Sequence, residues 1–97
     1  MHVISYKPIR EFIDDHPDAR IKLKRWYKWM KKGKFNDYNE IKRKFPSVDY
    51  IGNDRYVFNI CGNKYRLVAL INYCKQKAFV RFIGTHSEYE KINCNTV

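Results

Sequence analysis

This sequence has few acidic residues and no long apolar run. Its 97 residues include 20 Lys or Arg but only 10 Asp or Glu, which gives a net charge of +10. So large a positive excess on a small protein predicts a polyanion or an acidic protein as its partner. The longest uninterrupted apolar run covers residues 67–71, which is too short to span a bilayer, so no membrane segment is expected. The N-terminal residues lack a basic segment followed by an apolar one, so no secretory signal is expected either.

Cysteine is also rare and is not arranged in pairs. Cys61, Cys74 and Cys94 are odd in number and include no C-x-x-C motif. This pattern predicts reduced thiols in a cytoplasmic protein rather than a disulfide framework or a zinc site. The three histidines include no pair spaced four residues apart, so we expect neither a metal ion nor a cofactor.

The first half of the chain has apolar residues at helical spacing. A first helix is expected to end before Pro17, and a second to begin with Asp18 as its N-cap and to end at Gly33. Residues 37–44 are expected to form a short third helix. Before these helices, residues 2–4 are expected to form an edge strand.

The second half is rich in β-branched and aromatic segments of strand length. Four strands are expected there, at residues 48–51, 56–60, 65–73 and 78–83. The third of these is apolar on both faces near its middle, so it should be the central strand. The chain is therefore predicted to be one domain, residues 1–97, with an α+β fold. N-terminal helices pack on a mostly antiparallel β-sheet of three to five strands.

The turn sequences predict which residues face each other across the sheet. If Gly62 and Asn63 form a two-residue turn, Asn59 lies opposite Arg66 on the neighbouring strand. Both side chains then lie on the same face of the sheet, next to the end of the hairpin.

A second hairpin extends this row of polar residues. If residues 75–76 form its turn, Arg66 lies opposite Thr85, and Leu70 lies opposite Arg81. Arg81 would then share the face of Arg66, further along the strand. A bulge in either strand would shift the row.

Arg66 and His86 together predict a chemistry. A guanidinium fixed on a strand can hold a phosphate by two parallel hydrogen bonds, and an imidazole can move a proton near neutral pH. This combination favours phosphodiester cleavage. RNA supplies its own nucleophile in the 2′-OH, so no metal ion is needed.

The predicted second and third helices carry most of the excess charge. Residues 20–44 hold 11 Lys or Arg against Asp37 and Glu40, a net charge of +9, with Tyr27 and Trp29 interleaved. This pattern is typical of nucleic-acid binders. It makes five basic residues candidates for phosphate binding: Lys24, Arg25, Lys28, Lys31 and Lys32.

Two longer segments resemble a known family. The sequences YVFNICGNKYRLVA at residues 56–69 and FVRFIGTHSEY at residues 79–89 resemble the HigB branch of the RelE/ParE toxin superfamily, as do FPSVD at residues 45–49 and MHVI at residues 1–4. The resemblance implies a RelE-like fold and the toxin of a type II toxin–antitoxin system. Most such toxins are ribosome-dependent mRNA endonucleases that inhibit translation in the cytoplasm.

The resemblance also implies roles for individual residues. Arg66 would hold the scissile phosphate while the adjacent 2′-OH attacks it, leaving a 2′,3′-cyclic phosphate. His86 would act as general acid or base, and Tyr89 would stack on a base or assist proton transfer. The other residues that the resemblance brings to this site are Arg81, Lys64, which would add positive charge, and Asn63, which would chiefly shape the turn.

The partners follow from the same resemblance. They are a folded helix-turn-helix antitoxin similar to HigA, the ribosome and its mRNA, with operator DNA reached only through the antitoxin. Three other functions stay open at this point: a ParE-like inhibitor of DNA gyrase, a non-catalytic RNA-binding module, and a toxin-like regulator without activity. Arg66 could also be structural, paired with an acid such as Glu88.

Overall fold

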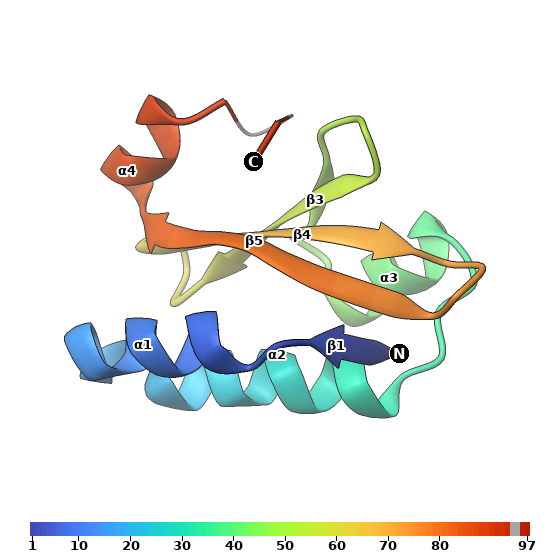
Figure 1. The fold of residues 1–97 in the computed structure, drawn as a ribbon, viewed down its shortest axis with the longest axis horizontal. Helices are drawn as coiled ribbons and strands as arrows, with labels where there is room; N and C mark the ends of the chain where they lie inside the picture. Colours follow the sequence, from blue (N-terminus) through green and yellow to red (C-terminus); the bar gives the residue numbers. More distant parts are fainter. Residues whose placement is uncertain (94–95) are drawn as a thin grey trace.

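The computed structural model describes residues 1–93 and 96–97 (Figure 1). Its four α-helices and five strands confirm the predicted α+β fold. Along the chain the elements are β1 (His2–Ile4), α1 (Lys7–Asp15), the 3-10 helix η1 (Pro17–Ala19), α2 (Arg20–Lys32), α3 (Tyr38–Lys44), β2 (Asp49–Tyr50), β3 (Arg55–Ile60), β4 (Tyr65–Asn72), β5 (Lys77–Thr85) and α4 (His86–Lys91).

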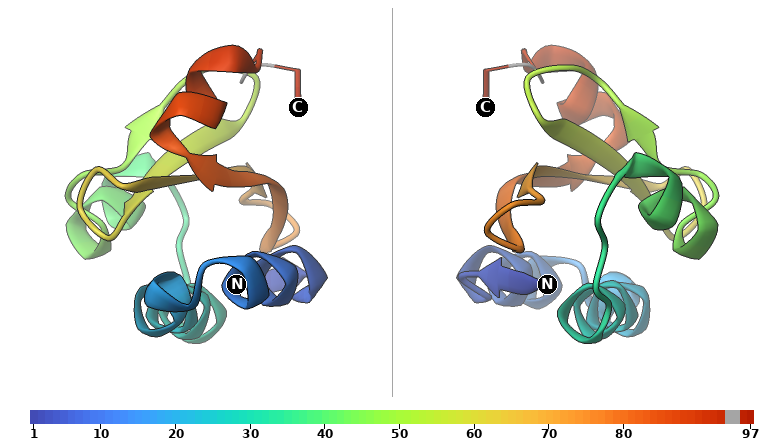
Figure 2. Two further views of the ribbon diagram at one scale, coloured as in Figure 1. Left: turned by 90° about the vertical axis from the view of Figure 1, so that its left-hand side faces the viewer. Right: turned by 90° about the vertical axis from the view of Figure 1, so that its right-hand side faces the viewer.

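The five strands form one mixed sheet with the order β1-β5-β4-β3-β2. As predicted, the strand of β4 is central and β1 is an edge strand. Every neighbouring pair is antiparallel except β1 and β5, which run parallel. Helices α1 and α2 lie side by side against one side of the sheet, while α4 lies on the other side (Figures 1 and 2). The sheet therefore has one face that forms the core with α1 and α2, and one face next to α4.

Alternation along β4 separates these two faces. The side chains of Tyr65, Leu67, Ala69 and Ile71 are buried in the core shared with α2. Because successive residues of a strand point to opposite faces, Arg66 points away from that core, toward the face next to α4. The central strand thus places a guanidinium on the face opposite the helical layer.

The N-terminus of α3 is capped by Asp37, whereas that of α2 does not have the cap predicted from the sequence. Asp37 caps α3, as its carboxylate accepts a hydrogen bond from the Glu40 N–H at 3.0 Å. The prediction that Asp18 caps α2 is wrong, because Asp18 lies in η1 and Ala19 is the N-cap residue of α2. The carboxylate of Asp18 instead accepts a hydrogen bond from the Tyr65 hydroxyl at 2.8 Å, a partner 47 residues further along the chain.

The β3–β4 hairpin has the predicted register. Asn59 pairs with Arg66, and Val57 pairs with Val68. The turn is tight because Gly62 adopts a positive φ of 67°, a region that costs glycine little.

The β4–β5 hairpin does not have the predicted register. Its turn covers residues 73–76, and Asn72 pairs with Lys77, so residues 75–76 are not the centre of the turn. The Asn72 side chain fixes this earlier turn by accepting a hydrogen bond from the Lys75 N–H at 3.0 Å.

A bulge then shifts the register again. Ala69 pairs with Val80 and Val68 with Phe82, which leaves Arg81 as the extra residue of β5. Leu70 lies on the turn side of the bulge and is opposite Phe79 because of the earlier turn, and not opposite Arg81 as predicted.

The predicted pairing of Arg66 with Thr85 is also wrong. Arg66 lies opposite Gly84, while Thr85 lies opposite Tyr65. The polar row across the three strands therefore ends on a residue without a side chain.

The other expectations concern thiols, membranes and metals. Cys61 and Cys74 are free thiols, and Cys94 lies outside the described residues. None of the described helices is long and apolar enough to cross a membrane. Within residues 1–93 and 96–97, no group of three or more His, Cys, Asp or Glu could hold a metal ion.

Candidate active site at the hairpin end of the sheet

Arg66 is held in place by the backbone of its own hairpin. One terminal nitrogen of its guanidinium donates hydrogen bonds to the carbonyl oxygens of Asn63 at 3.0 Å and Tyr65 at 3.4 Å. Among the described residues it forms no ion pair, so the pairing with Glu88 considered from the sequence is not made. The half-buried guanidinium therefore has a fixed position and an uncompensated charge, which suits it to bind an anion.

Gly84 lies opposite Arg66 and lets two other side chains approach the sheet there. A Cβ atom at Gly84 would lie 2.5 Å from the tip of the Phe82 ring and 3.2 Å from Oε1 of Glu88. The ring and the carboxylate therefore approach the sheet where it lacks a side chain. The sequence analysis missed Gly84, because it placed Thr85 opposite Arg66.

Helix α4 begins directly after this position and carries His86. Thr85 caps the helix: its hydroxyl accepts a hydrogen bond from the Glu88 N–H at 3.2 Å, and the Glu88 carboxylate accepts one from the Thr85 N–H at 2.8 Å. The second of these bonds holds the pKa of Glu88 below its usual value. The reciprocal bonds fix the first turn of α4 relative to β5.

His86 is exposed on that first turn. Its backbone N–H donates to the carbonyl oxygen of Lys64 at 3.3 Å, which ties α4 to the β3–β4 hairpin. Its Nε2 lies 2.8 Å from Oε1 of Glu90, one turn further along the helix. This contact orients the imidazole and leaves Nδ1 for exchange with another group.

The structure gathers some of the predicted site residues and separates others. Four of them lie around the same end of the sheet: Asn63, Lys64, Arg66 and His86. The carbonyl oxygen of Lys64 accepts a hydrogen bond from the backbone N–H of His86, and the carbonyl oxygen of Asn63 accepts one from the guanidinium of Arg66. No hydrogen bond or ion pair joins Arg66 to His86 in the part of the chain that is described.

Tyr89 and Arg81 differ in their surroundings. Tyr89 is half-buried on α4, with its ring centroid 6.5 Å from that of Phe82. Arg81 is exposed in the bulge and lines a hollow of about 380 Å³ together with Asp15 and His16 of the α1 end. Arg81 has no partner on β4, so it does not continue the row of Arg66 across the sheet, and its hollow also includes Phe82 and Glu88.

Lys64 is paired with a residue that the sequence analysis did not place here. Its ammonium contacts the carboxylate of Asp18, which also accepts the Tyr65 hydroxyl bond. The bonds from Lys64 and Tyr65 lower the pKa of Asp18, and the bond to Asp18 raises the pKa of Lys64. No local pattern could have shown this contact, because the two side chains are 46 residues apart.

Comparison with known proteins identifies the family of this chain. Residues 19–92, which include the hairpin and α4, match the family HigB_toxin, described as the RelE-like toxic component of a toxin–antitoxin system. The chain belongs to the HigB toxin family. The match confirms the predicted RelE-like fold and implies an antitoxin as the partner of the toxin.

The chain is also similar to curated HigB proteins over nearly its whole length. It is 33% identical over 94 residues to the mRNA interferase HigB of Escherichia coli O6:H1, covering 95% of this chain and 91% of that protein. It is likewise 33% identical over 93 residues to the mRNA interferase toxin HigB of E. coli K12 and to the mRNA interferase HigB of Shigella flexneri. Each of those matches covers 93% of this chain and 88% of the relative.

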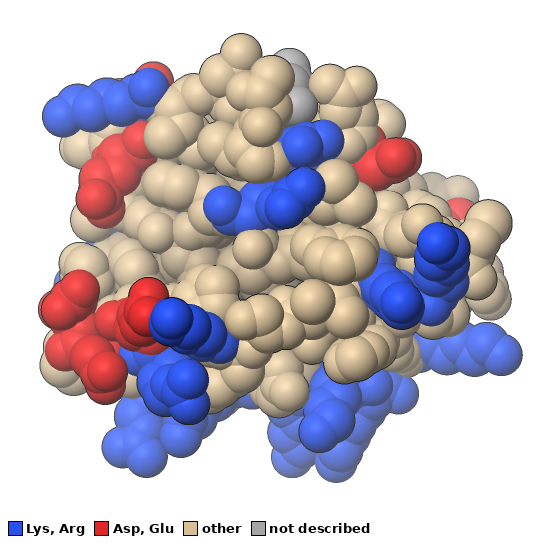
Figure 3. Space-filling view, in the orientation of Figure 1, with Lys and Arg blue, Asp and Glu red and all other residues tan. Residues whose placement is uncertain are grey.

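This HigB toxin carries a second charged surface on α2. The five predicted phosphate-binding residues are all exposed: Lys24, Arg25, Lys28, Lys31 and Lys32. None of them forms an ion pair with any described residue. In Figure 3 basic side chains follow the lower edge, where α2 runs in Figure 1, whereas acidic side chains gather near α1 and α4. The α2 surface is thus positive and uncompensated, as a polyanion-binding surface should be.

Proposed function

We propose that this HigB-family chain is a ribosome-dependent mRNA endonuclease, which inhibits translation by a reaction that needs no metal ion. The family is the toxic half of toxin–antitoxin systems, and relatives that match nearly the whole chain are named mRNA interferases. These similarities support endoribonuclease activity. The surface charge supports the substrate, because a net charge of +10 favours association with RNA.

The observation that carries the proposal is the setting of Arg66. Its guanidinium is fixed by the carbonyl oxygens of Asn63 and Tyr65, and it has no carboxylate partner among the described residues. A positioned cation of this kind can bind the scissile phosphate and stabilise the negative charge that develops on it. Asn63 would contribute by shaping the turn, and Lys64 would add positive charge when phosphate replaces Asp18 as its partner.

His86 would move the proton in this reaction. The 2′-OH loses a proton as its oxygen attacks the adjacent phosphorus, and the 5′-oxygen of the next nucleotide gains one as its bond to phosphorus breaks. The products are a 2′,3′-cyclic phosphate and a free 5′-OH, so no water, metal ion or cofactor is consumed. His86 would serve as the base or the acid, held in orientation by Glu90.

Tyr89 and Arg81 have supporting roles in the proposal. Tyr89, one turn after His86 on α4, would stack on an mRNA base or assist proton transfer. Arg81, exposed in the bulge of β5, would contact a phosphate outside the scissile one.

The proposal also includes three partners besides the mRNA: ribosomal RNA, an antitoxin and operator DNA. The basic residues of α2 would hold ribosomal RNA in the cytoplasm, while Arg66 and His86 face the mRNA. A helix-turn-helix antitoxin similar to HigA would neutralise the toxin, and the pair would reach operator DNA through the antitoxin.

Induced expression followed by mapping of transcript ends tests the proposal. Wild-type protein should arrest growth and produce new 5′ ends within translated regions, whereas the Arg66→Ala variant should lose most of both effects. Removing one such electrostatic group typically costs about 10²–10³-fold in rate. Arg10→Ala is the matched control, because Arg10 is an exposed arginine on α1. Far-UV circular dichroism should show that both variants are folded.

Four results would contradict the proposal. Full toxicity of Arg66→Ala would remove Arg66 from the site, and intact transcripts with damaged DNA would indicate gyrase inhibition instead. RNA binding without growth arrest would indicate a non-catalytic module. Cleavage of naked mRNA at the rate seen on translating ribosomes would remove the ribosome from the proposal.

A further inference from the structure

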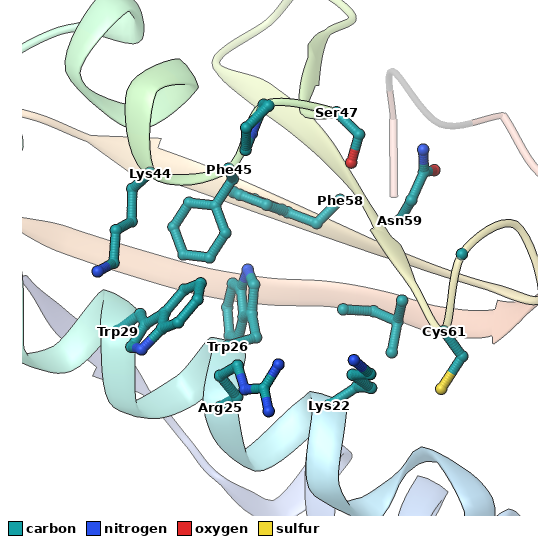
Figure 4. Close-up of a pocket in the computed structure, with 13 residues that line it drawn as sticks. Lys22, Arg25, Trp26, Trp29, Lys44, Phe45, Ser47, Phe58, Asn59 and Cys61 are labelled. Carbon is teal, nitrogen blue, oxygen red and sulfur yellow. The ribbon is translucent and has the colours of Figure 1, made fainter.

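A hollow lies between α2 and the outer edge of β3. Its volume is about 240 Å³, below the roughly 300–1,000 Å³ of pockets for drug-sized ligands, so it suits one small ring. Residues of α2, the segment after α3, and β3 line it, and Figure 4 shows their side chains. We call this hollow the α2–β3 pocket. Neither Arg66 nor His86 lines it.

The rim of the α2–β3 pocket is positively charged. Lys22 and Arg25 reach it from α2, and Lys44 reaches it from the end of α3 (Figure 4). All three are exposed and form no ion pair with a described residue. Of the described residues that line the pocket, none is acidic. The pocket therefore attracts an anionic ligand.

The walls of the pocket are aromatic. Trp29 and Phe45 have ring centroids 5.9 Å apart, and Phe45 in turn contacts Phe58 edge-on at 5.2 Å. Trp26 lies beneath them at 2% exposure, and in Figure 4 its indole nitrogen points toward the phenylalanines. Trp29 is only half-buried. One tryptophan thus belongs to the core, while the other keeps part of its ring accessible.

Cations already lie against the ring of Trp29. Nζ of Lys44 is 4.2 Å from its centroid, and Cζ of Arg25 is 5.9 Å from it. A planar base that stacks on the face of Trp29 next to Lys44 would take the place of this ammonium, which could then bind a phosphate of the same strand. Aromatic platforms next to basic side chains are how proteins bind single-stranded nucleic acid.

A polar group lies at the opposite rim. The Ser47 hydroxyl lines the pocket and makes no hydrogen bond within the described chain. Asn59 also lines the pocket, but its side chain lies on the face of the sheet that carries Arg66. Strand β2 pairs only with Tyr56 and Val57, so no described strand covers the outer edge of β3 beyond Val57. The edge of a base could hydrogen-bond to Ser47.

We propose that the α2–β3 pocket binds one unpaired base of a single-stranded RNA, with the flanking phosphates on Lys22, Arg25 and Lys44. The base stacks on Trp29 in place of the Lys44 ammonium, and Ser47 contacts its edge. The inference rests on the proposed function only in taking RNA as the polyanion, and neither Arg66 nor His86 lines its site. An acidic peptide would pair with the cations but would not stack on the ring of Trp29.

Binding of a labelled 2′-O-methyl pentanucleotide, measured by fluorescence polarisation, tests this proposal. The 2′-O-methyl groups block cleavage by 2′-OH attack, so binding is measured apart from catalysis. The matched ligand has the same backbone with an abasic central nucleotide. Wild-type protein should bind the intact strand about 5- to 150-fold more tightly, since stacking of one base contributes that much.

Two variants test whether the preference for the intact strand comes from Trp29. Trp29→Ala should bind intact and abasic strands equally, because the stacking surface is gone. Lys28→Ala removes an exposed α2 cation that does not line the pocket, so it should weaken both strands by the same factor and keep the preference. If Trp29→Ala fails to fold, Trp29→Phe retains a smaller ring and should show a reduced preference.

Several outcomes would overturn the proposal. Equal binding of both strands by wild-type protein would show that no base is bound, and an unchanged preference in Trp29→Ala would place the base elsewhere. Displacement of the intact strand by polyglutamate, with the same loss in Trp29→Ala, would make the pocket a protein-docking site. Any of these outcomes would overturn the pocket proposal without affecting cleavage that depends on Arg66. Absence of cleavage would overturn the proposed function without affecting the preference for the intact strand.

Discussion

The hairpin end of the sheet and the outer surface of α2 carry positive charge in opposite ways. At the hairpin, Arg66 is fixed by backbone carbonyls, and Lys64 is paired with Asp18. On α2, all seven basic side chains are exposed and have no acidic partner in the described chain. A fixed charge can be aimed at one atom, whereas exposed and unpaired charges attract any nearby phosphate. We therefore expect the hairpin end to set the rate of cleavage and the α2 surface to set affinity.

The largest effect expected from this comparison is that of His86→Ala. Loss of the proton-transferring group should lower the single-turnover rate at saturating ribosomes by about 10²–10⁴-fold, because general acid–base catalysis typically contributes that much. Affinity for ribosomes should stay unchanged. His2→Ala is the control, since His2 is also exposed but lies on β1. An affinity loss as large as the rate loss would show that the two surfaces are not separate in function.

Sequence reasoning predicted the first hairpin because its turn is marked locally. Gly62 fixes the turn, and the strand alternation then places Asn59 opposite Arg66, as observed. The family motifs identified the same segment. The fold class and the central position of β4 followed from patterns of equally short range.

The second hairpin was predicted wrongly for two physical reasons. The Asn72 side chain draws the turn one residue earlier, and a bulge at Arg81 shifts the strand again. The earlier turn leaves no mark in the hydrophobic pattern, and the bulge leaves only the spacing of Val80 and Ile83, which are three residues apart and both pack on the core. The strict alternation assumed from the sequence therefore did not reveal Gly84 beside Arg66. Contacts of long range were missed for the same reason, as the bond of Asp18 to the Tyr65 hydroxyl shows.

Gly84→Ala tests whether the close approach of Phe82 and Glu88 opposite Arg66 is needed for cleavage. The added Cβ would lie 2.5 Å from the Phe82 ring, so the ring and the Glu88 carboxylate must move. Misplacement of a site by about 1 Å can lower a rate up to about 10²-fold, and we expect a loss of about 10- to 100-fold. The single-turnover rate measures it.

Ser87→Ala is the control for that change, because Ser87 is exposed on the same helix. Urea denaturation should show whether Gly84→Ala is destabilised by about 1–3 kcal/mol, as overpacking commonly causes. An unchanged rate in a folded Gly84→Ala protein would mean that Phe82 and Glu88 do not shape the site.

The double variant Lys28→Ala/Lys32→Ala examines the other surface. Each lysine that contacts a phosphate contributes about 0.7–0.9 to the slope of log affinity against log salt, so the slope should fall by up to about twice that. The cleavage rate at saturating ribosomes should not change. Lys7→Ala is the matched control, because the ammonium of Lys7 already has an acidic partner, Glu11, at 3.8 Å. A salt dependence equal to that of the wild type would exclude the α2 surface from RNA binding.

Asp18→Asn should have the smallest effect, and it links the two regions. Hydrogen bonds from Lys64 and Tyr65 lower the pKa of Asp18 in the folded protein. A carboxylate with a lowered pKa stabilises the fold at pH values above its unfolded pKa, about 3.9, and loses that contribution as the pH falls through the lower, folded value. The free energy of unfolding of Asp18→Asn should therefore lie slightly below the wild-type value at pH 7.

The same substitution releases Lys64 at the hairpin. Because the pair is exposed, the stability difference is small, and it should shrink as the pH falls through the folded pKa of Asp18. The released ammonium adds an unpaired charge to the cleavage site, so the variant should cleave at least as fast as the wild type. A stability difference that persists at pH 2 would show that Asp18 acts through the geometry of its hydrogen bonds rather than through its charge.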